Sequence, residues 1–324
     1  MRRGIGRAAA LLALMLGGGA HAQTLQKVIY LLPAPKVQPA FGPWMVADQR
    51  GYFKAEGLDV EFITARGGVD AAKQVGAGNA VIGGAIGDTS ILVRANGVPV
   101  RTVALLGGQG FMQLVLNKDR VTSVADLKGK TVTTMAYQDT TFFALLGMLA
   151  TQGLTKNDIN GQAVGPVNIW KLFADGQADA MASVPEWTVW ARNAAPKMNM
   201  QIIPSDTLFK SMAQAVVASD ETIQKNPELI RKLVRATLHG LEDIKADPAG
   251  SAKDYVKQIT QYADTEPVIA DIFKMYDQYV YPGQKVTGAV DPDRLASLQE
   301  FYLKQGIIEK TSPVADLYTN QFVQ

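Results

Sequence analysis

The sequence contains no cysteine. This absence excludes a disulfide framework, a cysteine nucleophile and a lipid anchor attached through cysteine. Histidine is almost as scarce, because only His239 lies outside the first 22 residues. One histidine without cysteine provides no His/Cys metal cluster and poor material for a Ser-His-Asp triad. We therefore expect no metal, no cofactor and no catalytic residue, and interpret the protein as a non-enzyme.

A long apolar run is also missing from the chain after its first residues. At the N-terminus, arginines at positions 2, 3 and 7 precede a short apolar segment over 8–16 and a small-residue cleavage site over 20–22. This order is typical of a cleaved export signal, whereas a retained anchor would need a longer run. We predict that residues 1–22 are a signal peptide and that the mature protein lies free in the periplasm, not as a lipoprotein.

The excess of basic over acidic residues in the chain comes from this signal. Without its three arginines the formal net charge of the chain changes from +2 to −1. The mature sequence has no basic stripe, so we expect no binding to nucleic acid. Roughly 300 mature residues exceed what one hydrophobic core usually holds and favour two domains or lobes.

Strand-like and helix-like segments alternate through the first half of the mature chain. This alternation is typical of a mainly parallel α/β sheet, whose ligand crevice lies at the carboxyl ends of its strands. The expected strands are 28–32, 57–65, 80–82 and 98–106, and the expected helices are 45–53, 69–75 and 90–94. The Pro-rich segment 33–44 should lack regular structure.

The second half repeats this plan. A helix ending on glycine, a small apolar strand and a polar loop occur at 76–88 and again at 174–187, which predicts two similar lobes facing each other. Further expectations are strand-turn-helix over 165–176, a strand then a loop over 178–187, a returning strand at 214–219, and C-terminal helices over 226–241, 259–276 and 291–306.

The segment 129–153 joins a strand to a helix through a polar loop. The loop 137–141 can cap the helix, where free N–H groups and the helix dipole favour a ligand oxygen. The role of Asp139 is open. It could face a ligand, or it could be the N-cap, in which case it would occupy the helix end itself and repel an anion. At the other end, Gly153 and Leu154 match the C′ and C″ positions of a Schellman motif.

Polar and aromatic residues gather where the expected strands end, as a small-molecule pocket requires. Arg66 could hold a carboxylate, sulfonate or phosphate group, or it could be solvated or bridge the lobes. A ligand with an amine or ring N–H donor is favoured instead by Asp88, Asp139 and Glu186, and the sequence leaves this conflict open. The candidate ligand-binding residues are Phe41, Trp44, Arg66, Gly67, Asp88, Thr89, Gln109, Tyr137, Asp139, Thr140, Thr141, Glu186 and Trp187.

Five strings of the sequence resemble the periplasmic substrate-binding proteins of ABC importers, of the nitrate/sulfonate/taurine type that is also called SsuA/THI5-like or NMT1-like. The strings are ADQRGYFKAEGLDVEF at 47–62, GAGNAVIGG at 76–84, VADLKGKTV at 124–132, GQADAM at 176–181 and PEW at 185–187. Together they span most of the chain, and the first and third are fairly specific in combination.

The resemblance implies a type II periplasmic-binding-protein fold, with two α/β lobes and C-terminal helices packed on lobe 1. Lobe 1 would comprise residues 23–111 and 215–324, and lobe 2 residues 112–214. Two hinge segments are expected near 108–117 and 212–219. The ligand would lie between the lobes, and an ABC permease in the inner membrane would recognise the closed form.

In many relatives the loop at the helix start is small and rich in Gly and Ser, which suits a compact anion. Tyr137 and Asp139 depart from that pattern and favour a larger organic ligand, such as a substituted sulfonate, an aromatic acid or a pyrimidine-like solute. We therefore expect a monomeric solute-binding subunit of an ABC import system. The alternatives are a periplasmic solute sensor for a membrane receptor and a pyrimidine-synthase-like enzyme on the same fold, whose known members rely on a cysteine-rich motif that is absent here.

Overall fold

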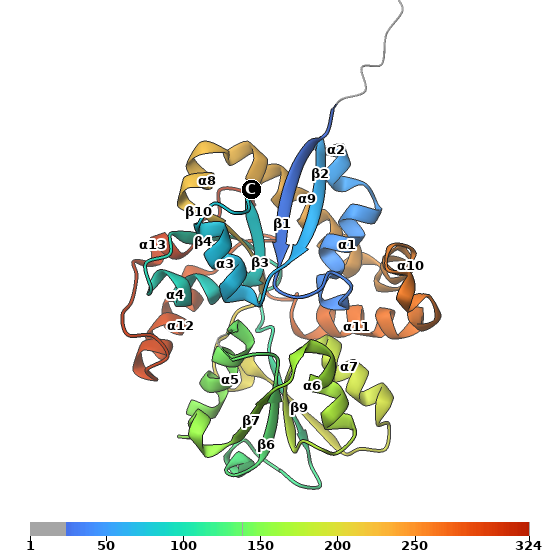
Figure 1. The fold of residues 1–324 in the computed structure, drawn as a ribbon, viewed down its shortest axis with the longest axis vertical. Coiled ribbons are helices and arrows are strands. Elements are labelled where there is room, and N and C mark those ends of the chain that lie inside the picture. The colour runs from blue at the N-terminus through green and yellow to red at the C-terminus, as the bar shows by residue number, and fades with distance from the viewer. Residues whose placement is uncertain (1–23, 138, 324) are drawn as a thin grey trace, which may run out of the picture.

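The computed structural model describes residues 24–137 and 139–323, which form two α/β lobes (Figure 1). The predicted signal peptide at 1–22 lies outside the described residues, as does Gln138 of the polar loop. Each lobe is built on one five-stranded sheet with helices packed against it. Among the helices that the structure describes, none combines the length and apolarity of a membrane span.

The upper lobe of Figure 1 contains a sheet of strand order β2-β1-β3-β10-β4. Strand β1 runs parallel to β2 and β3, whereas β10 is antiparallel to β3 and β4 because it returns from the lower lobe. The bounds are β1 Gln26–Leu32, β2 Leu58–Thr64, β3 Ile82–Ile86, β4 Val100–Leu105 and β10 Gln214–Ser219.

The lower lobe contains the second sheet, of order β7-β6-β8-β5-β9. Strand β6 is parallel to β7 and β8, and β5 is antiparallel to β8 and β9. The two sheets therefore have the same plan. In each sheet, the strand that enters from the other lobe, β10 or β5, runs antiparallel to its neighbours. The bounds are β5 Gln113–Asn117, β6 Thr131–Thr134, β7 Asn160–Ala163, β8 Ala180–Ser183 and β9 Met200–Pro204.

Helices cover both sheets. In the upper lobe they are the 3-10 turn η1 Pro39–Phe41, α1 Gly42–Gln49, α2 Tyr52–Ala55, α3 Gly68–Gly76 and α4 Thr89–Arg94. In the lower lobe they are η2 Ala125–Leu127, α5 Thr140–Ala150, η3 Lys156–Asp158, α6 Gly165–Ala174, α7 Pro185–Ala194 and η4 Ser205–Thr207. The C-terminal segments are α8 Asp220–Lys225, α9 Pro227–Ala246, α10 Pro248–Gln258, η5 Thr260–Thr265, α11 Glu266–Tyr279, α12 Pro292–Lys304 and α13 Val314–Leu317.

The C-terminal helices pack on the upper lobe, where α9 lies along α1, and they also contact the lower lobe. Helix α11 packs against α7, and the ring of Tyr262 in η5 stacks on Trp190 of α7 with the centroids 5.7 Å apart. Figure 1 shows α11 directly above α6 and α7. The two lobes are thus in contact through this helical layer as well as through their connecting chain.

The chain crosses between the lobes over residues 106–112 and again over 205–213. The segments expected as hinges, near 108–117 and 212–219, extend further, into β5 and β10. Asp206 in the second crossing accepts hydrogen bonds from the Gly110 backbone N–H of the first crossing at 2.9 Å and from Arg294 of α12 at 2.6 Å. One carboxylate therefore joins both crossings to the C-terminal region.

The start of helix α5 decides a question that the sequence left open, and its end is as the sequence predicts. The Asp139 side chain accepts from the Thr141 backbone N–H, so it is the N-cap. At the other end, Gly153 has φ of 70° and donates to Ala150, and Leu154 donates to Leu149, both at 3.1 Å. This pair of hydrogen bonds confirms the Schellman motif.

Several segments differ from the sequence-based expectation. The strand expected at 80–82 is β3, and the helix expected over 259–276 is divided into η5 and α11, preceded by α10. Residues 165–176 form a helix rather than strand-turn-helix, and the strand of that region is β7, which precedes it. The segment after β8 is not a loop, because Pro185 occupies the first turn of α7. Within 33–44, Pro39 and Pro43 likewise start η1 and α1, since proline is compatible with a first helical turn.

Candidate functional site

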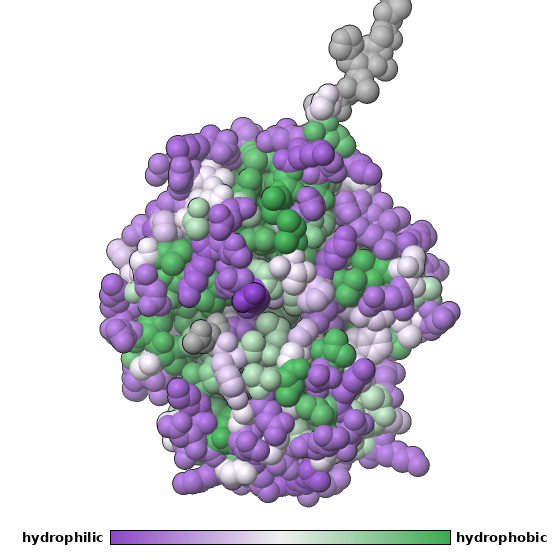
Figure 2. Space-filling model, viewed as in Figure 1, coloured by the Kyte–Doolittle hydropathy of each residue, from purple (hydrophilic) through white to green (hydrophobic). Residues whose placement is uncertain are grey.

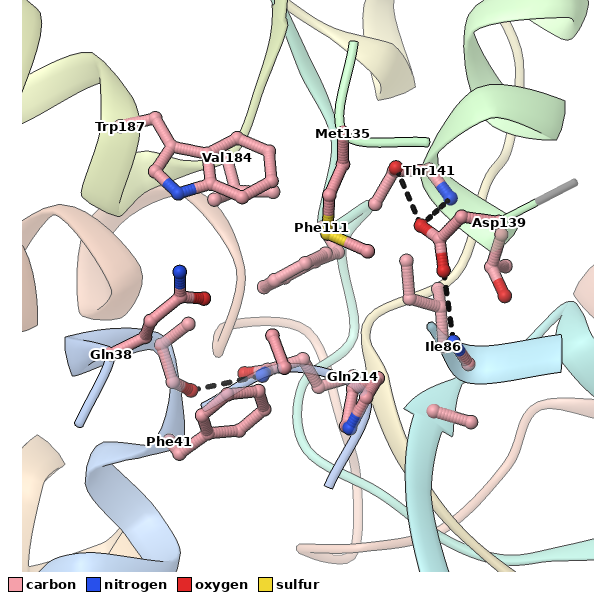
Figure 3. Close-up of a pocket in the computed structure, with 16 residues that line it drawn as sticks. Gln38, Phe41, Ile86, Phe111, Met135, Asp139, Thr141, Val184, Trp187 and Gln214 are labelled. Carbon is pink, nitrogen blue, oxygen red and sulfur yellow. Dashed lines mark hydrogen bonds between the residues drawn. The ribbon is translucent and has the colours of Figure 1, made fainter. Parts of the chain in front are cut away.

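A cavity lies between the lobes, where loops from both sheets meet (Figure 3). The cavity has a volume of about 40 Å³, and hydrogen bonds from Gly68 to Asp139 and from Ala40 to Glu186 join the two lobes beside it. At the surface, pale and apolar residues lie at the waist between the lobes, within a largely hydrophilic exterior (Figure 2). The lining residues are Pro33, Ala34, Gln38, Ala40, Phe41, Gly68, Ala85, Ile86, Phe111, Met135, Asp139, Thr140, Thr141, Val184, Trp187 and Gln214.

Aromatic and thioether side chains form the walls of this cavity. Phe41 comes from η1, Phe111 from the first crossing and Trp187 from the first turn of α7, and all three are buried. In Figure 3, Phe41 and Trp187 lie on opposite sides of the cavity, with Phe111 and Met135 beside them. Walls of this kind favour a flat apolar group, because ring faces offer a large contact area at little entropic cost.

Two buried polar atoms in the walls lack hydrogen-bond partners among the described residues. They are the indole Nε1 of Trp187 and the amide Oε1 of Gln214. The other amide atom of Gln214, Nε2, donates to the Ala40 carbonyl at 2.9 Å, which fixes the orientation of the amide. A buried polar atom without a partner costs roughly 1–3 kcal/mol. A ligand offering one acceptor to the indole and one donor to the amide oxygen would remove that cost.

Charge in the cavity is of one sign. Among the residues that the structure describes, no lysine or arginine lines it, and Asp139 is its one ionisable residue. One Asp139 oxygen accepts from the Gly68 backbone N–H at 2.9 Å, and the other accepts from the Thr141 backbone N–H at 3.0 Å. Burial raises the pKa of Asp139, and these hydrogen bonds act in the opposite direction. The cavity therefore offers no cation to an anionic ligand.

Glu186 makes a second contact between the lobes. It lies in the first turn of α7, is 3% exposed, and accepts a hydrogen bond from the Ala40 backbone N–H at 2.8 Å. Burial raises the pKa of Glu186 to about 8. Its carboxyl group is not among the groups that line the cavity, so it supports the closed arrangement from behind the wall.

Asp88 and Thr89 also lie beside the cavity rather than in its wall. Asp88 accepts from the hydroxyl group of Tyr302 in α12 at 2.5 Å, and burial raises the pKa of Asp88 to about 7. The hydroxyl oxygens of Thr89 and Thr140 are 2.8 Å apart across the lobes. These side chains thus contribute to packing between the lobes and to the attachment of α12.

The structure brings five of the sequence-predicted residues to the cavity, namely Phe41, Asp139, Thr140, Thr141 and Trp187. Glu186, Asp88 and Thr89 are buried next to it. The other predicted residues do not line the cavity, although Gly67 lies directly against Asp139.

Arg66 is exposed, and together with Gly67 it lines an open groove that adjoins the cavity, because Pro33, Ala34 and Met135 line both. Tyr137 is 54% exposed, and its hydroxyl group donates to the Gly161 carbonyl at 2.6 Å on the outer side of the lower lobe.

Trp44 is fully buried in the core of the upper lobe, in edge-to-face contact with Tyr30. Its ring also packs edge-to-face on that of Phe41, with the centroids 5.9 Å apart, so it supports Phe41 from within the core. Gln109 lies in a further surface groove near Gly283. Neither residue reaches the cavity.

Eleven of the sixteen lining residues escaped the sequence reasoning, and Gln38, Phe111, Met135 and Gln214 are among them. One of them carried a usable signal, because Gln214 is a lone amide at the head of the otherwise apolar strand QAVVAS. A polar residue in such a strand needs a partner. The described residues contain no group of three His, Asp or Glu side chains placed to hold a metal ion.

Comparison with known proteins places this geometry in a family. A family model described as NMT1/THI5 like matches residues 38–251, which include strands of both sheets. The chain belongs to the NMT1/THI5-like family. The sequence-based family assignment is thereby confirmed.

Relatives of this NMT1/THI5-like chain carry two kinds of name. The riboflavin-binding protein RibY of Chloroflexus aurantiacus is 27% identical over 310 residues, which cover 93% of this chain and 87% of RibY. A 4-amino-5-hydroxymethyl-2-methylpyrimidine phosphate synthase of Aspergillus parasiticus is 25% identical over 233 residues, which cover 67% of each chain.

A solved structure similar to this chain is that of the alkanesulfonate-binding protein SsuA from Xanthomonas axonopodis pv. citri bound to MOPS. Its TM-score is 0.71 at 17% sequence identity, and the match covers 91% of this chain and 98% of SsuA. The likeness confirms the predicted fold class, the two-lobed fold of periplasmic binding proteins.

Proposed function

We propose that this protein is the solute-binding subunit of an ABC import system. In this proposal it resides in the periplasm after removal of residues 1–22, acts as a monomer, and presents its closed form to an inner-membrane permease. Support comes from the NMT1/THI5-like family, the two-lobed fold, and a cavity lined by both lobes. Light scattering of the purified protein tests whether it is a monomer. Uptake of solute by vesicles that contain the cognate permease tests whether that permease is its partner.

The ligand in this proposal is an uncharged, flat nitrogen heterocycle. The observation that carries it is the pairing of aromatic walls with one unpaired donor, Trp187 Nε1, and one unpaired acceptor, Gln214 Oε1. Of the three ligand classes expected from the sequence, this chemistry fits a pyrimidine-like solute better than a sulfonate or an aromatic acid, since no lysine or arginine among the described residues lines the cavity. A relative named for binding riboflavin, a flat and uncharged nitrogen heterocycle, supports the same class.

Binding requires the lobes to separate first. The closed cavity has a volume of about 40 Å³, which is far too little for a heterocycle. Ligand-cavity volumes in proteins are typically about 300–1,000 Å³. A solute would therefore enter an open form, and closure would bring Trp187 and Phe41 onto its two faces.

Titration calorimetry with riboflavin, 4-amino-5-hydroxymethyl-2-methylpyrimidine and MOPS tests this proposal. We expect at least one of the two heterocycles to bind and to raise the melting temperature, and MOPS to do neither. Tight binding of MOPS with no response to either heterocycle would refute the ligand class. No response to any of these solutes, or to a wider panel of heterocycles, would count against solute binding itself.

The variant Trp187→Phe tests the proposed donor. It keeps an aromatic face but loses the indole N–H, so we expect affinity for the heterocycle to fall about fivefold to tenfold, the cost of one hydrogen bond. Trp170→Phe is the matched control, because Trp170 stacks on Trp190 away from the cavity. Equal losses in the two variants would argue against a direct contact.

A synthase-like enzyme is the second candidate, because several relatives are named as pyrimidine phosphate synthases. The sequence argues against it, since the chain has no cysteine and one histidine outside its first 22 residues, which leaves little material for nucleophilic or metal-assisted catalysis. Prolonged incubation with candidate substrates, followed by mass spectrometry, should yield no pyrimidine phosphate. Stoichiometric or catalytic formation of that product would replace the binding proposal.

A further inference from the structure

Asp139 lies where the N-termini of two helices from different lobes meet. Helix α3 begins at Gly68 in the upper lobe and α5 at Thr140 in the lower lobe. Asp139 Oδ2 accepts from the Gly68 N–H at 2.9 Å, and Oδ1 accepts from the Thr141 N–H at 3.0 Å and from its hydroxyl group at 2.6 Å. Figure 3 shows these three hydrogen bonds at one edge of the cavity. One carboxylate therefore caps helices in both lobes.

Free N–H groups and the helix dipole make a helix N-terminus attractive to anions, and two converging N-termini reinforce each other. In this protein the anion is a side chain of the chain itself, and it is 2% exposed. A solute anion would have to displace Asp139 or lie beside it with no lysine or arginine of the described cavity lining to balance the charge.

The backbone opposite Asp139 is shaped to receive the carboxylate. Gly67 has φ of 102°, and a Cβ atom there would lie 2.2 Å from Asp139 Oδ2. A Cβ atom at Gly68 would lie 2.7 Å from the hydroxyl oxygen of Thr140. Any other residue at either position would push the carboxylate or the lower lobe away, so the glycine pair permits this close approach.

A second and independent observation concerns the rest of the cavity. Trp187 Nε1 and Gln214 Oε1 are unpaired among the described residues, and both side chains are more than nine-tenths buried. They offer a ligand one donor and one acceptor. Both groups are uncharged, so neither supplies a cation that would balance an anionic solute beside Asp139.

We propose that Asp139 sets the charge selectivity of the solute site. Its carboxylate occupies the anion position between the two helix N-termini, so the site accepts uncharged solutes and rejects anionic ones. This inference rests on the proposed function for its biological meaning. The occupied anion position is a physical property that can be tested without the solute.

The variant Asp139→Ala, titrated with formate, acetate and nitrate at pH 7, tests the anion position. Removal of the carboxylate leaves the donors of Gly68 and Thr141 free, so a small anion should bind there. We expect the melting temperature of the variant to rise by about 3 °C at an anion concentration tenfold above its Kd, and that of the unchanged protein to stay constant. The control is Asp291→Ala, because Asp291 caps α12 alone at an exposed position, and we expect no such rise.

Two further variants make the outcome decisive. Asp139→Asn fills the position without charge and should not respond to formate. Asp139→Ser also leaves room for the anion and should respond. It provides a second test of anion binding if Asp139→Ala folds only when formate is present. Three results would overturn the inference. They are an equal response of the unchanged protein, no response of folded Asp139→Ala, and failure of both Asp139→Ala and Asp139→Ser to fold even with formate.

The same variants separate this inference from the proposed function. MOPS should bind Asp139→Ala at least tenfold more tightly than the unchanged protein. If the anion response is absent while a heterocycle still binds the unchanged protein, the role of Asp139 is wrong and the receptor function stands. If anions rescue the variant but no heterocycle binds, the anion position stands and the receptor function fails.

Discussion

Replacing Glu186 by glutamine removes one buried carboxyl group from the contact between the lobes. The amide oxygen of the variant can still accept from the Ala40 backbone N–H, which Glu186 accepts at 2.8 Å. The shape of the side chain is also nearly unchanged. The substitution therefore changes the titration of this position and little else.

The magnitude follows from two pKa values. The pKa of the Glu186 carboxyl group is 4.5 without its surroundings, and burial raises it to about 8. Between these pH values the folded protein binds one proton more than the unfolded chain, so this group makes the free energy of unfolding fall as pH rises. The slope is about 1.4 kcal/mol per pH unit, or roughly 4 kcal/mol from pH 5 to pH 8. Separation of the lobes would hydrate Glu186 without unfolding, so this figure is an upper value.

Urea unfolding of both proteins at pH 5, 6, 7 and 8 measures the effect. We expect Glu186→Gln to match the unchanged protein at pH 5 and to be more stable by up to roughly 4 kcal/mol at pH 8, because glutamine does not titrate. Asp88 and Asp139 titrate in both proteins and cancel in the difference. Glu300→Gln, at an exposed position of α12, is the control and should leave the pH dependence unchanged. Parallel pH curves for Glu186→Gln and the unchanged protein would refute the reasoning.

Two further substitutions test the connection between the lobes. Arg294→Ala leaves the half-buried carboxylate of Asp206 without its charged partner, and we expect a loss of about 2–4 kcal/mol in urea unfolding, whereas the exposed Arg192→Ala should cost less than about 0.5 kcal/mol. Gly107→Ala places a Cβ atom 2.2 Å from a backbone carbonyl oxygen and should lower stability by more than about 2 kcal/mol, whereas Gly51→Ala, with φ of 75° and open space around it, should cost about 1 kcal/mol in the same measurement.

The local features of the fold were predictable from the sequence. The N-cap Asp139 and the Schellman pair at Gly153 and Leu154 act within a few residues of their own helix, so the chain itself contains the signal. Strand β3 shows the limit of this approach. Its glycines Gly83 and Gly84 fit against neighbouring strands and leave little apolar pattern to recognise, so the expected strand ended at residue 82.

The site was less predictable because its contacts join distant parts of the chain. Asp139 and Gly68 are 71 positions apart, and Glu186 and Ala40 are 146 apart. The sequence placed Arg66 correctly just after a strand, but the backbone beyond the strand decides where such a side chain points. The conflict between an arginine and three acidic residues was therefore open at that stage. In the structure the arginine is exposed and the acidic groups are buried.

The carboxylate of Asp206 fastens two chain crossings to the same helix, through Gly110 and Arg294. Movement of one crossing away from the other would break a hydrogen bond of that carboxylate. We therefore expect the proposed opening of the lobes to keep this junction intact and to bend the backbone on either side of it.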